Sequence, residues 1–483
     1  MRASRLVLVS VVACSGPGLD AREATLASTL ARADETLIRA RPALVAGKYA
    51  DMAGSTYDWY RGSLAVYARD WQDDATSVLA SSAFALDAPL VLANGDPHVE
   101  NFGALIAADG SIAIEENDFD SADYYPYLYD LRRFLVGLVV ATYASNSDDP
   151  AAQEAAIAAR RDVARAGAAS YAAAIAALAA GGPATRVTSA GSDPILEDVL
   201  SRSHADAATR SELGSLTTLS GTTRTLIRGA IDPTVPDNTL SDLPAYDQAA
   251  LAEALAEYTQ TLESPPPPEF FTVLDAAREL GAGVASWPRV RALVLVRGPS
   301  DDPSDDVVLE VKEEADSGAG FYPPYVYFDS VQARVTGTSR AIWRGASASP
   351  LWGASTWVGF PVQVRLESDG QKGVKTKRFT GSRGTVAALI ALASDLGALL
   401  ARVHATPSPV SDDPAGAIAA RIASDPEGFA DEQANVALSY GDRAFADYAR
   451  FQHVLDVLGP RLGVPLDPSD APSPDLAALF GSP

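Results

Sequence analysis

The spacing of apolar residues predicts a mainly helical first half of the chain. Residues 21–48, 65–87 and 150–181 combine Ala, Leu and charged side chains at helical spacing, and the Ala-rich composition of the last segment favours a helix further. Two short apolar runs, 88–94 and 111–117, are typical of buried strands. We therefore expect long helices around a small pair of strands.

The pattern changes at four consecutive prolines, residues 265–268. A helix is predicted just before them, at 246–263, and prolines cannot continue it. Beyond them, strand-like runs predict a sheet of about four or five strands, and these runs are 291–297, 307–313, 356–367 and 373–380. Helical spacing is found within this region at 329–343, and again after it at 384–405 and 426–458.

These patterns predict an α+β chain in two lobes. The helical lobe takes residues 21–265, and the helices within 383–460 return to it. The sheet lobe takes residues 269–382 and is expected to be a small antiparallel sheet. Residues 1–20 and the Pro- and Asp-rich tail at 461–483 lie outside both lobes.

The balance of charge excludes one class of partner. The chain has 38 Lys and Arg against 62 Asp and Glu, a formal net charge of −24. Because such a surface repels phosphate backbones, we expect no sequence-independent binding to nucleic acid. Beyond the N-terminus, no uninterrupted apolar run reaches the ~18 residues that suggest a membrane-spanning helix.

The N-terminus resembles the signal of a bacterial lipoprotein. Arg2 and Arg5 precede an apolar run at 6–13 that is too short to span a bilayer, and the run ends in Val-Val-Ala before Cys14. Such a signal is cut before the cysteine, whose thiol is then lipidated. We therefore expect residues 1–20 to be a signal and tether. The protein would be anchored in the cell envelope if this signal is used, and cytoplasmic otherwise.

One group of polar residues predicts a catalytic site. Asp96, His98 and Asn101 lie in a loop after the first predicted strand, and Asp118 and Asp120 follow the second. A hairpin-like unit would bring these two groups together. Phosphoryl transfer needs a carboxylate to orient the acceptor and oxygen ligands for Mg²⁺. Asp96 fits the first role, and Asn101, Asp118 and Asp120 fit the second. His98 is expected to hold the loop by hydrogen bonds.

This pattern is similar to that of known phosphotransferases. The order Gly-Asp-x-His-x-x-Asn, then Asp-Phe-Asp, then a later Asp-Leu resembles the catalytic and metal loops of aminoglycoside and choline phosphotransferases. The resemblance implies that Asp130 braces the catalytic loop. It also implies a protein-kinase-like fold that uses ATP with Mg²⁺.

Most of the chain resembles an uncharacterised bacterial family, domain of unknown function 2252. The resemblance spans about residues 45–460, and its motifs in order are KYADMAGSTYDWYRGS, NGDPHVENFG, NDFDSADYYPYLYDLRR, VLDAARELGAGVAS, VLEVKEEADS, SVQARVTG and LGALLARVHA. In ordinary kinases the lobe that clamps the nucleotide comes first, whereas here the catalytic loop does. We therefore expect a rearranged or circularly permuted kinase-like architecture.

The resemblance also implies which residues hold the nucleotide. Gly281 and Gly283 would cover its phosphates with backbone N–H groups, and Lys312 would hold them as a point charge. Arg365 is assigned to the same cofactor site, where it would contact substrate or brace the sheet. Arg61 is given a similar supporting role from the first helical region.

Two departures from the family pattern concern this clamp. The family tends to have Gly-x-Gly-Ser-x-Gly in the loop, whereas here Val284 replaces the serine and Ser286 the last glycine. The predicted helix at 329–343 has no Glu to pair with the clamp lysine, so Glu313 or Glu314 would have to substitute.

Three hypotheses follow from these residues. The first is an ATP- and Mg²⁺-dependent phosphotransferase, or a nucleotidyl transferase, acting on an unknown acceptor. The second is a lipid-anchored, pseudokinase-like binding protein without turnover. The third is a metal-dependent phosphoesterase that uses Asp96, His98, Asp118 and Asp120 around two ions. A kinase-like site predicts Lys312 within reach of Asp118.

Overall fold

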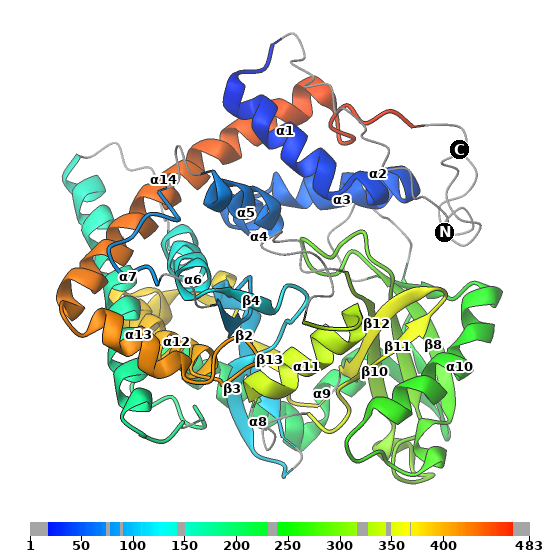
Figure 1. Cartoon of the computed structure of the whole chain (residues 1–483). Coiled ribbons are helices and arrows are strands. Elements are labelled where there is room, and N and C mark those ends of the chain that lie inside the picture. The colour runs from blue at the N-terminus through cyan, green and yellow to red at the C-terminus, as the bar shows by residue number, and fades with distance from the viewer. Residues whose placement is uncertain are drawn as a thin grey trace, which may run out of the picture.

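Helices wrap two separate groups of strands in this chain (Figure 1). A computed structural model describes residues 18–73, 78–86, 90–107, 109–142, 150–184, 186–229, 239–315, 327–343, 349–367 and 369–466. Cys14, the predicted signal and most of the predicted tail lie outside the described residues. Mixed helices and antiparallel sheets agree with the predicted α+β class.

The N-terminal helices are shorter than the sequence pattern predicts. Residues 21–48 form α1 (Ala21–Ala33), α2 (Glu35–Ala40) and the start of α3 (Pro42–Met52), with breaks at Asp34 and Arg41. The next two helices are α4 (Thr56–Gly62) and α5 (Leu64–Gln72). The helix predicted at 65–87 is therefore confirmed only as far as Gln72, because residues 78–86 form turns, and buried Arg132 donates to carbonyls of these turns.

Five further helices build the main helical layer around one large apolar core. They are α6 (Tyr127–Ala141), α7 (Pro150–Ala179), α12 (Val386–His404), α13 (Pro414–Ile422) and α14 (Pro426–Leu458). Two glycines allow α7 and α12 to approach closely, since a Cβ on Gly397 would lie 2.4 Å from the carbonyl oxygen of Gly167. Among the described helices, α12 alone is long and apolar enough to cross a membrane, and 61% of its most apolar window is buried inside the protein.

Short strands lie against this helical layer. β1 (Leu90–Ala93) pairs with β4 (Asp123–Pro126), and β2 (Phe102–Ile106) forms an antiparallel hairpin with β3 (Ile112–Glu116). β13 (Lys372–Gly373) adds to the free side of β2. β1 and β3 agree with the two predicted strands, whereas β2 was not predicted.

The strand predicted at 373–380 is wrong beyond its first residue. After β13 the chain forms a 3-10 turn, Thr376–Arg378, instead of continuing the sheet. The reason is local polar bonding. The backbone N–H and the hydroxyl of Thr376 both donate to Glu100, and Arg378 pairs with Asp198.

The second group of strands is a six-stranded antiparallel sheet in the order β11-β12-β10-β9-β8-β7. Its strands are β7 (Thr239–Asp242), β8 (Val273–Leu280), β9 (Arg291–Val296), β10 (Val307–Glu313), β11 (Gly353–Trp357) and β12 (Phe360–Leu366). α10 (Ala245–Thr261) covers one face through an apolar cluster. Because β7 and α10 precede the four prolines, this layer begins before the predicted lobe boundary.

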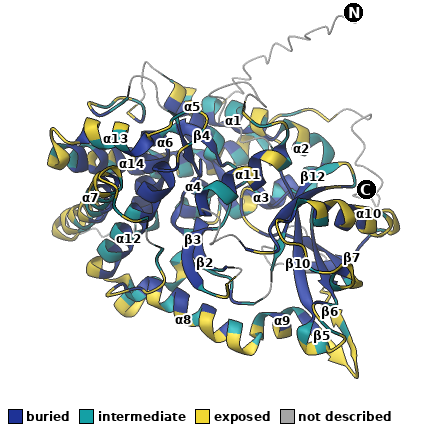
Figure 2. Cartoon of the chain, turned by 60° about the horizontal axis from the view of Figure 1, so that its bottom comes forward, coloured by how far each residue is buried: buried dark blue, intermediate teal, exposed yellow. Residues whose placement is uncertain are grey.

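Smaller elements complete the molecule. α8 (Pro194–Thr209) and α9 (Ser211–Leu216) lead into the hairpin of β5 (Thr217–Ser220) and β6 (Thr223–Leu226). α11 (Val331–Trp343) connects β10 to β11. Figure 2 shows that β2, β3 and β10 run through the buried interior, whereas α7 and α10 carry exposed faces. The polar residues on these inner strands are therefore shielded from bulk water.

Candidate active site

The loop after β1 has a shape that a glycine and a buried carboxylate make possible. Gly95 has a positive φ of 80°, and a Cβ there would lie 2.3 Å from the carbonyl oxygen of Ser121. The backbone N–H groups of Gly95 and Asn94 donate to the two oxygens of Asp130, at 2.7 and 3.2 Å. Asp130 also lies 3.1 Å from Nε2 of His404. Asp130 thus holds the loop backbone from α6.

Asp96 is fixed by an arginine that the sequence analysis did not assign. Nε of Arg133 donates to Oδ1 of Asp96 at 2.7 Å, and its Nη2 donates to the carbonyl oxygen of Tyr60. The guanidinium lies 3.8 Å from the centroid of the Tyr60 ring. Burial raises the pKa of Asp96 to about 6, although Arg133 opposes this rise. Asp96 is therefore an oriented carboxylate poised to gain or lose a proton.

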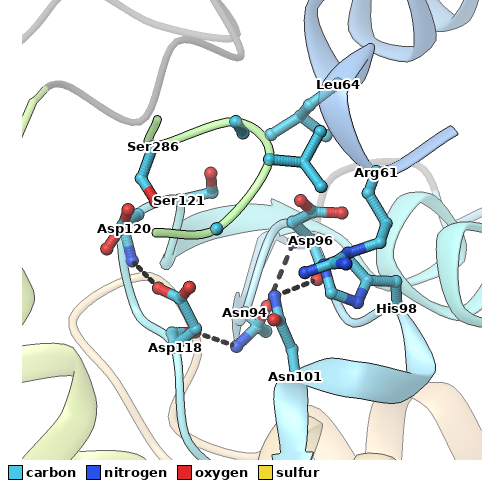
Figure 3. A pocket seen from close by; sticks show the side chains of 13 residues that line it. Arg61, Leu64, Asn94, Asp96, His98, Asn101, Asp118, Asp120, Ser121 and Ser286 are labelled. Atoms are coloured by element: carbon cyan, nitrogen blue, oxygen red, sulfur yellow. Dashed lines mark hydrogen bonds between the residues drawn. The ribbon is translucent and has the colours of Figure 1, made fainter. Parts of the chain in front are cut away.

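The β2–β3 hairpin brings the predicted metal residues together. Asn101 precedes β2 and Asp118 follows β3, and the N–H of Asn117 donates to the carbonyl oxygen of Asn101 at 3.1 Å. The amide nitrogen of Asn101 donates to the carbonyl oxygen of Asp96 at 2.9 Å. Side chains of Asp96, His98, Asn101, Asp118 and Asp120 all line one cavity of about 90 Å³ (Figure 3).

Lys312 reaches this site from β10 of the sheet. Its Nζ lies 2.5 Å from Oδ1 of Asp120 and 3.4 Å from Oδ1 of Asp118. Burial alone would lower the pKa of Lys312, but the two carboxylates raise it. Burial and Asp120 raise the pKa of Asp118, whereas Lys312 lowers that of Asp120 despite its burial. The ammonium group thus lies where two carboxylates converge.

The predicted glycine loop closes the cavity from the sheet side. Gly281 and Gly283 have positive φ values of 76° and 72°, and the residues from Gly283 to Ser286 line the cavity. Gly281 itself is not among the lining residues. Val284, which stands where the family tends to have serine, is buried in an apolar cluster with the N-terminal helices. This substitution therefore anchors the loop instead of adding a hydroxyl to it.

Among the described residues, the ion pairs of Lys312 are with Asp118 and Asp120, and not with either of the two glutamates that follow it. Oε2 of Glu313 accepts from Nη1 of Arg41 at 2.6 Å and from the N–H of Val290 at 2.7 Å. Glu314 is buried beside Asp120 and Lys312, and burial raises its pKa well above the usual value. Glu314 is therefore the nearer of the two candidates to the lysine.

Arg365, like Gly281, Asp130 and Lys312, is not among the residues that line the cavity. Its Nε donates to Oε2 of Glu310 at 2.6 Å, and its Nη1 donates to the carbonyl oxygen of Asn117 at 3.0 Å. Of the two roles considered for it, the contacts favour bracing the sheet against the β2–β3 hairpin.

Arg61 and His98 lie on the helical side of the cavity. Nη1 of Arg61 is 3.4 Å from Glu100 and 3.6 Å from Asp58. His98 is buried, and its Nδ1 has no hydrogen-bond partner among the described residues. Burial, together with Arg61 and Arg133, lowers the pKa of His98 well below its usual value. The histidine is therefore neutral near pH 7.

A second arginine missed by the sequence analysis fixes the Asp-Phe-Asp turn. Arg334 of α11 donates to the carbonyl oxygens of Phe119, Asp120 and Ala122, the last at 2.7 Å. This role could not be predicted from local spacing, because Arg334 lies more than 200 residues from the turn that it holds.

Comparison with known proteins gives one match. The profile of the family described as uncharacterized proteins conserved in bacteria, DUF2252, matches residues 39–454. Neither the curated proteins nor the solved structures contain a match to this chain.

Proposed function

The chain belongs to the DUF2252 family of uncharacterized bacterial proteins, and we propose that it is an ATP- and Mg²⁺-dependent phosphotransferase with a kinase-like site. The observation that carries the proposal is the position of Lys312. Lys312 does not itself line the cavity, but it reaches Asp118 and Asp120, which do, from the sheet, while Asp96 lines the same cavity from the helical side. A site with a cation, metal-type carboxylates and a separate base is what phosphoryl transfer requires.

The donor set of the cavity fits Mg²⁺. Asp118 and Asp120 offer carboxylate oxygens, and the amide nitrogen of Asn101 is already engaged, which leaves its oxygen available as a ligand. No group of three or more His, Cys, Asp or Glu in the described part of the chain is arranged to hold a metal. Such a partial set suits Mg²⁺, which usually takes one or two carboxylates and completes its shell with water and phosphate. The ion would supply charge neutralisation at the transferred phosphoryl group.

The residues at the sheet side fit the phosphates of ATP. Lys312 can pair with phosphate oxygens, and the loop from Gly283 to Ser286 presents backbone to the cavity. A cavity of about 90 Å³ holds several water molecules, so it corresponds to the phosphate end of the nucleotide and not to the whole.

The proposed reaction assigns Asp96 to the acceptor. A hydroxyl oxygen of the acceptor forms a bond to the γ-phosphorus, the bond from that phosphorus to the β–γ bridging oxygen breaks, and ADP leaves. Asp96 accepts the hydroxyl proton, while Arg133 keeps its carboxylate oriented. Neutral, buried His98 lies beside Asp96 in the same cavity (Figure 3).

The other hypotheses remain distinguishable from this one. Nucleotidyl transfer would use the same cavity and differs in the product, AMP attached to the acceptor. A binding protein without turnover would hold nucleotide and form no product. A two-metal phosphoesterase is less favoured because it gives Lys312, which is bonded to both aspartates, no role in the reaction.

The test is calorimetric binding of Mg·ATP to the full chain. We expect binding that requires Mg²⁺ and that weakens at least about tenfold in Asp118→Asn and in Lys312→Ala, since each removes a charged contact. Lys377→Gln, an exposed lysine outside the cavity, is the matched control and should bind as the natural protein does. Absence of binding at millimolar nucleotide would leave the anchored binding protein as the better hypothesis.

A further inference from the structure

One segment of this acidic protein is strongly basic. Residues 371–383 contain Lys372, Lys375, Lys377, Arg378 and Arg383 and no Asp or Glu, in a chain with a net charge of −24. The segment begins at β13, which pairs with β2 of the active-site hairpin. Its charges are therefore placed by the fold beside the candidate site.

Hydrogen bonds attach this segment to the catalytic loop. Oε1 of Glu100 accepts from both the backbone N–H and the hydroxyl of Thr376, each at 2.8 Å. The other oxygen of Glu100 lies 3.4 Å from Nη1 of Arg61 and 3.8 Å from Nζ of Lys375. One carboxylate oxygen thus stands between two cations without a close hydrogen bond to either.

Positive charge is in excess around this point. Asp198 alone accepts from three arginines, namely Arg202, Arg378 and Arg383. The Lys375 side chain is 47% exposed, and its one ion pair in the described structure is the long contact to Glu100. Among the described residues, Arg61 makes only long ion pairs, and its Nε is buried without a hydrogen-bond partner. Each cation therefore makes only long contacts to the carboxylates that the structure describes, and a bound anion would share the two cations with Glu100.

Arg61 lines the cavity at its acceptor end, and Lys375, which does not line the cavity, approaches the same carboxylate oxygen of Glu100 as Arg61 does. Figure 3 shows Arg61 and His98 next to Asp96, with Asp118 and Asp120 at the opposite end. Lys312 satisfies the carboxylates at that opposite end. A molecule that presents a hydroxyl to Asp96 would therefore extend toward Arg61 and Lys375.

We propose that the acceptor is a small anionic alcohol, whose carboxylate or phosphate group binds between Arg61 and Lys375 while its hydroxyl faces Asp96. The guanidinium fork of Arg61 suits either anion, and Lys375 adds a point charge. This inference rests on the proposed phosphotransferase function. The transfer is the one described above, with the hydroxyl oxygen of the anionic alcohol as the nucleophile.

Matched small probes test the anion site on the full chain. Glycerol 3-phosphate and glycerate carry the two candidate anions, and glycerol carries none. Calorimetric titration should show millimolar binding of at least one anionic probe and none of glycerol. Affinity should fall about tenfold in Arg61→Gln and in Lys375→Gln, and should stay unchanged in Lys377→Gln. Glu100→Gln should increase the affinity, because it removes the carboxylate between the two cations.

Several outcomes would overturn the proposal. They are no binding of either anionic probe, an affinity in Arg61→Gln and Lys375→Gln that is unchanged from the natural protein, or a loss in Lys312→Ala as large as in Arg61→Gln, which would place the probe at the nucleotide end. Mg·ATP binding is measured separately on the same variants and should survive Arg61→Gln. If Mg·ATP does not bind but an anionic probe binds as expected, the proposed function is wrong and the anion site is supported.

Discussion

Arg133 shows how one buried residue can set the properties of another. Its guanidinium is wholly buried, stacks on Tyr60 and donates to Asp96. Burial raises the pKa of Asp96 to about 6 even with this partner. Without the arginine, the ionised carboxylate would be left buried and uncompensated, which is far more costly than an exposed charge.

We therefore predict that Arg133→Met destabilises the protein in a pH-dependent way. The loss should be roughly 3–5 kcal/mol at pH 8, where Asp96 is ionised, and smaller at pH 5, where Asp96 takes up a proton. Urea unfolding at pH 5, 6, 7 and 8 measures it. The double variant Asp96→Asn/Arg133→Met is the control, since it has no carboxylate to protonate. A loss that is equal at all pH values would contradict the coupling.

The sequence could predict only part of this site. Asp96, Asn101 and Asp118 were expected to meet through a hairpin-like unit of strands 88–94 and 111–117. They do line one cavity, although β1 pairs with β4 and β3 pairs with the unpredicted β2. Arg133 and Arg334 were not assigned, because their contacts depend on how helices α6 and α11 pack. That packing joins residues far apart in the chain, such as Arg334 and Ala122, and no local spacing records it.

The six-stranded sheet carries charged residues on a buried face. Nη1 of Arg291 and Nε of Arg365 each lie 2.6 Å from a carboxylate oxygen of Glu310. The carboxylate of Glu279 lies 3.7 Å from Nε of Arg291. Burial raises the pKa of Glu279 to about 7, and the two arginines help to lower that of Glu310 to about 2 against its burial. The two glutamates on this face therefore have opposite effects on stability.

We predict that Glu279 makes the protein less stable as the pH rises. In the unfolded chain Glu279 has its ordinary pKa of 4.5. The contribution of Glu279 to the free energy of unfolding is therefore fully present below pH 4.5, and it is lost as the pH rises to about 7. The slope should be at most about 1.4 kcal/mol per pH unit. Glu279→Gln should flatten the dependence of the urea midpoint on pH between 5 and 7. Glu310→Gln is the contrasting variant and should destabilise at every pH above 5.

The strands of the six-stranded and the three-stranded sheet show where the hydrophobic pattern predicts structure correctly and where it does not. β9 and β10 were predicted because both are apolar runs of strand length. Strand spacing at 373–380 was misleading, because Thr376 satisfies its donors on Glu100 and not on a neighbouring strand. β7 was missed because four residues provide too short a pattern, and its place comes from pairing with β8.

At the scale of the molecule, the N-terminal helices hold the glycine loop. Arg41, between α2 and α3, donates to the carbonyl oxygen of Pro288 at 2.9 Å and to Glu313 at 2.6 Å. Leu44 packs in a small buried cluster with Leu280 and Trp287, on either side of the loop. These contacts connect the start of the chain to the cover of the cavity.

We predict that Arg41→Gln loosens this cover. Amide hydrogens of residues 281–290 should exchange at least several-fold faster, because local opening of the loop loses a buried ion pair. Hydrogen exchange followed by mass spectrometry measures this directly. Arg39→Gln, which removes an exposed pair with Glu35 on α2, is the control and should leave the loop unchanged. Equal protection in both variants would show that Arg41 does not restrain the loop.

The late position of β13 and α12–α14 in the chain has a consequence for biosynthesis. β13 completes the strand layer of β2 and β3, and α12 and α14 cover α6 and α7, yet the whole six-stranded sheet is translated between these parts. A chain emerging from the ribosome can assemble the sheet while α6 and α7 still expose the apolar surfaces that α12 and α14 will bury. The loop after β1 therefore acquires its final support, including the contact of His404 with Asp130, only near the end of translation.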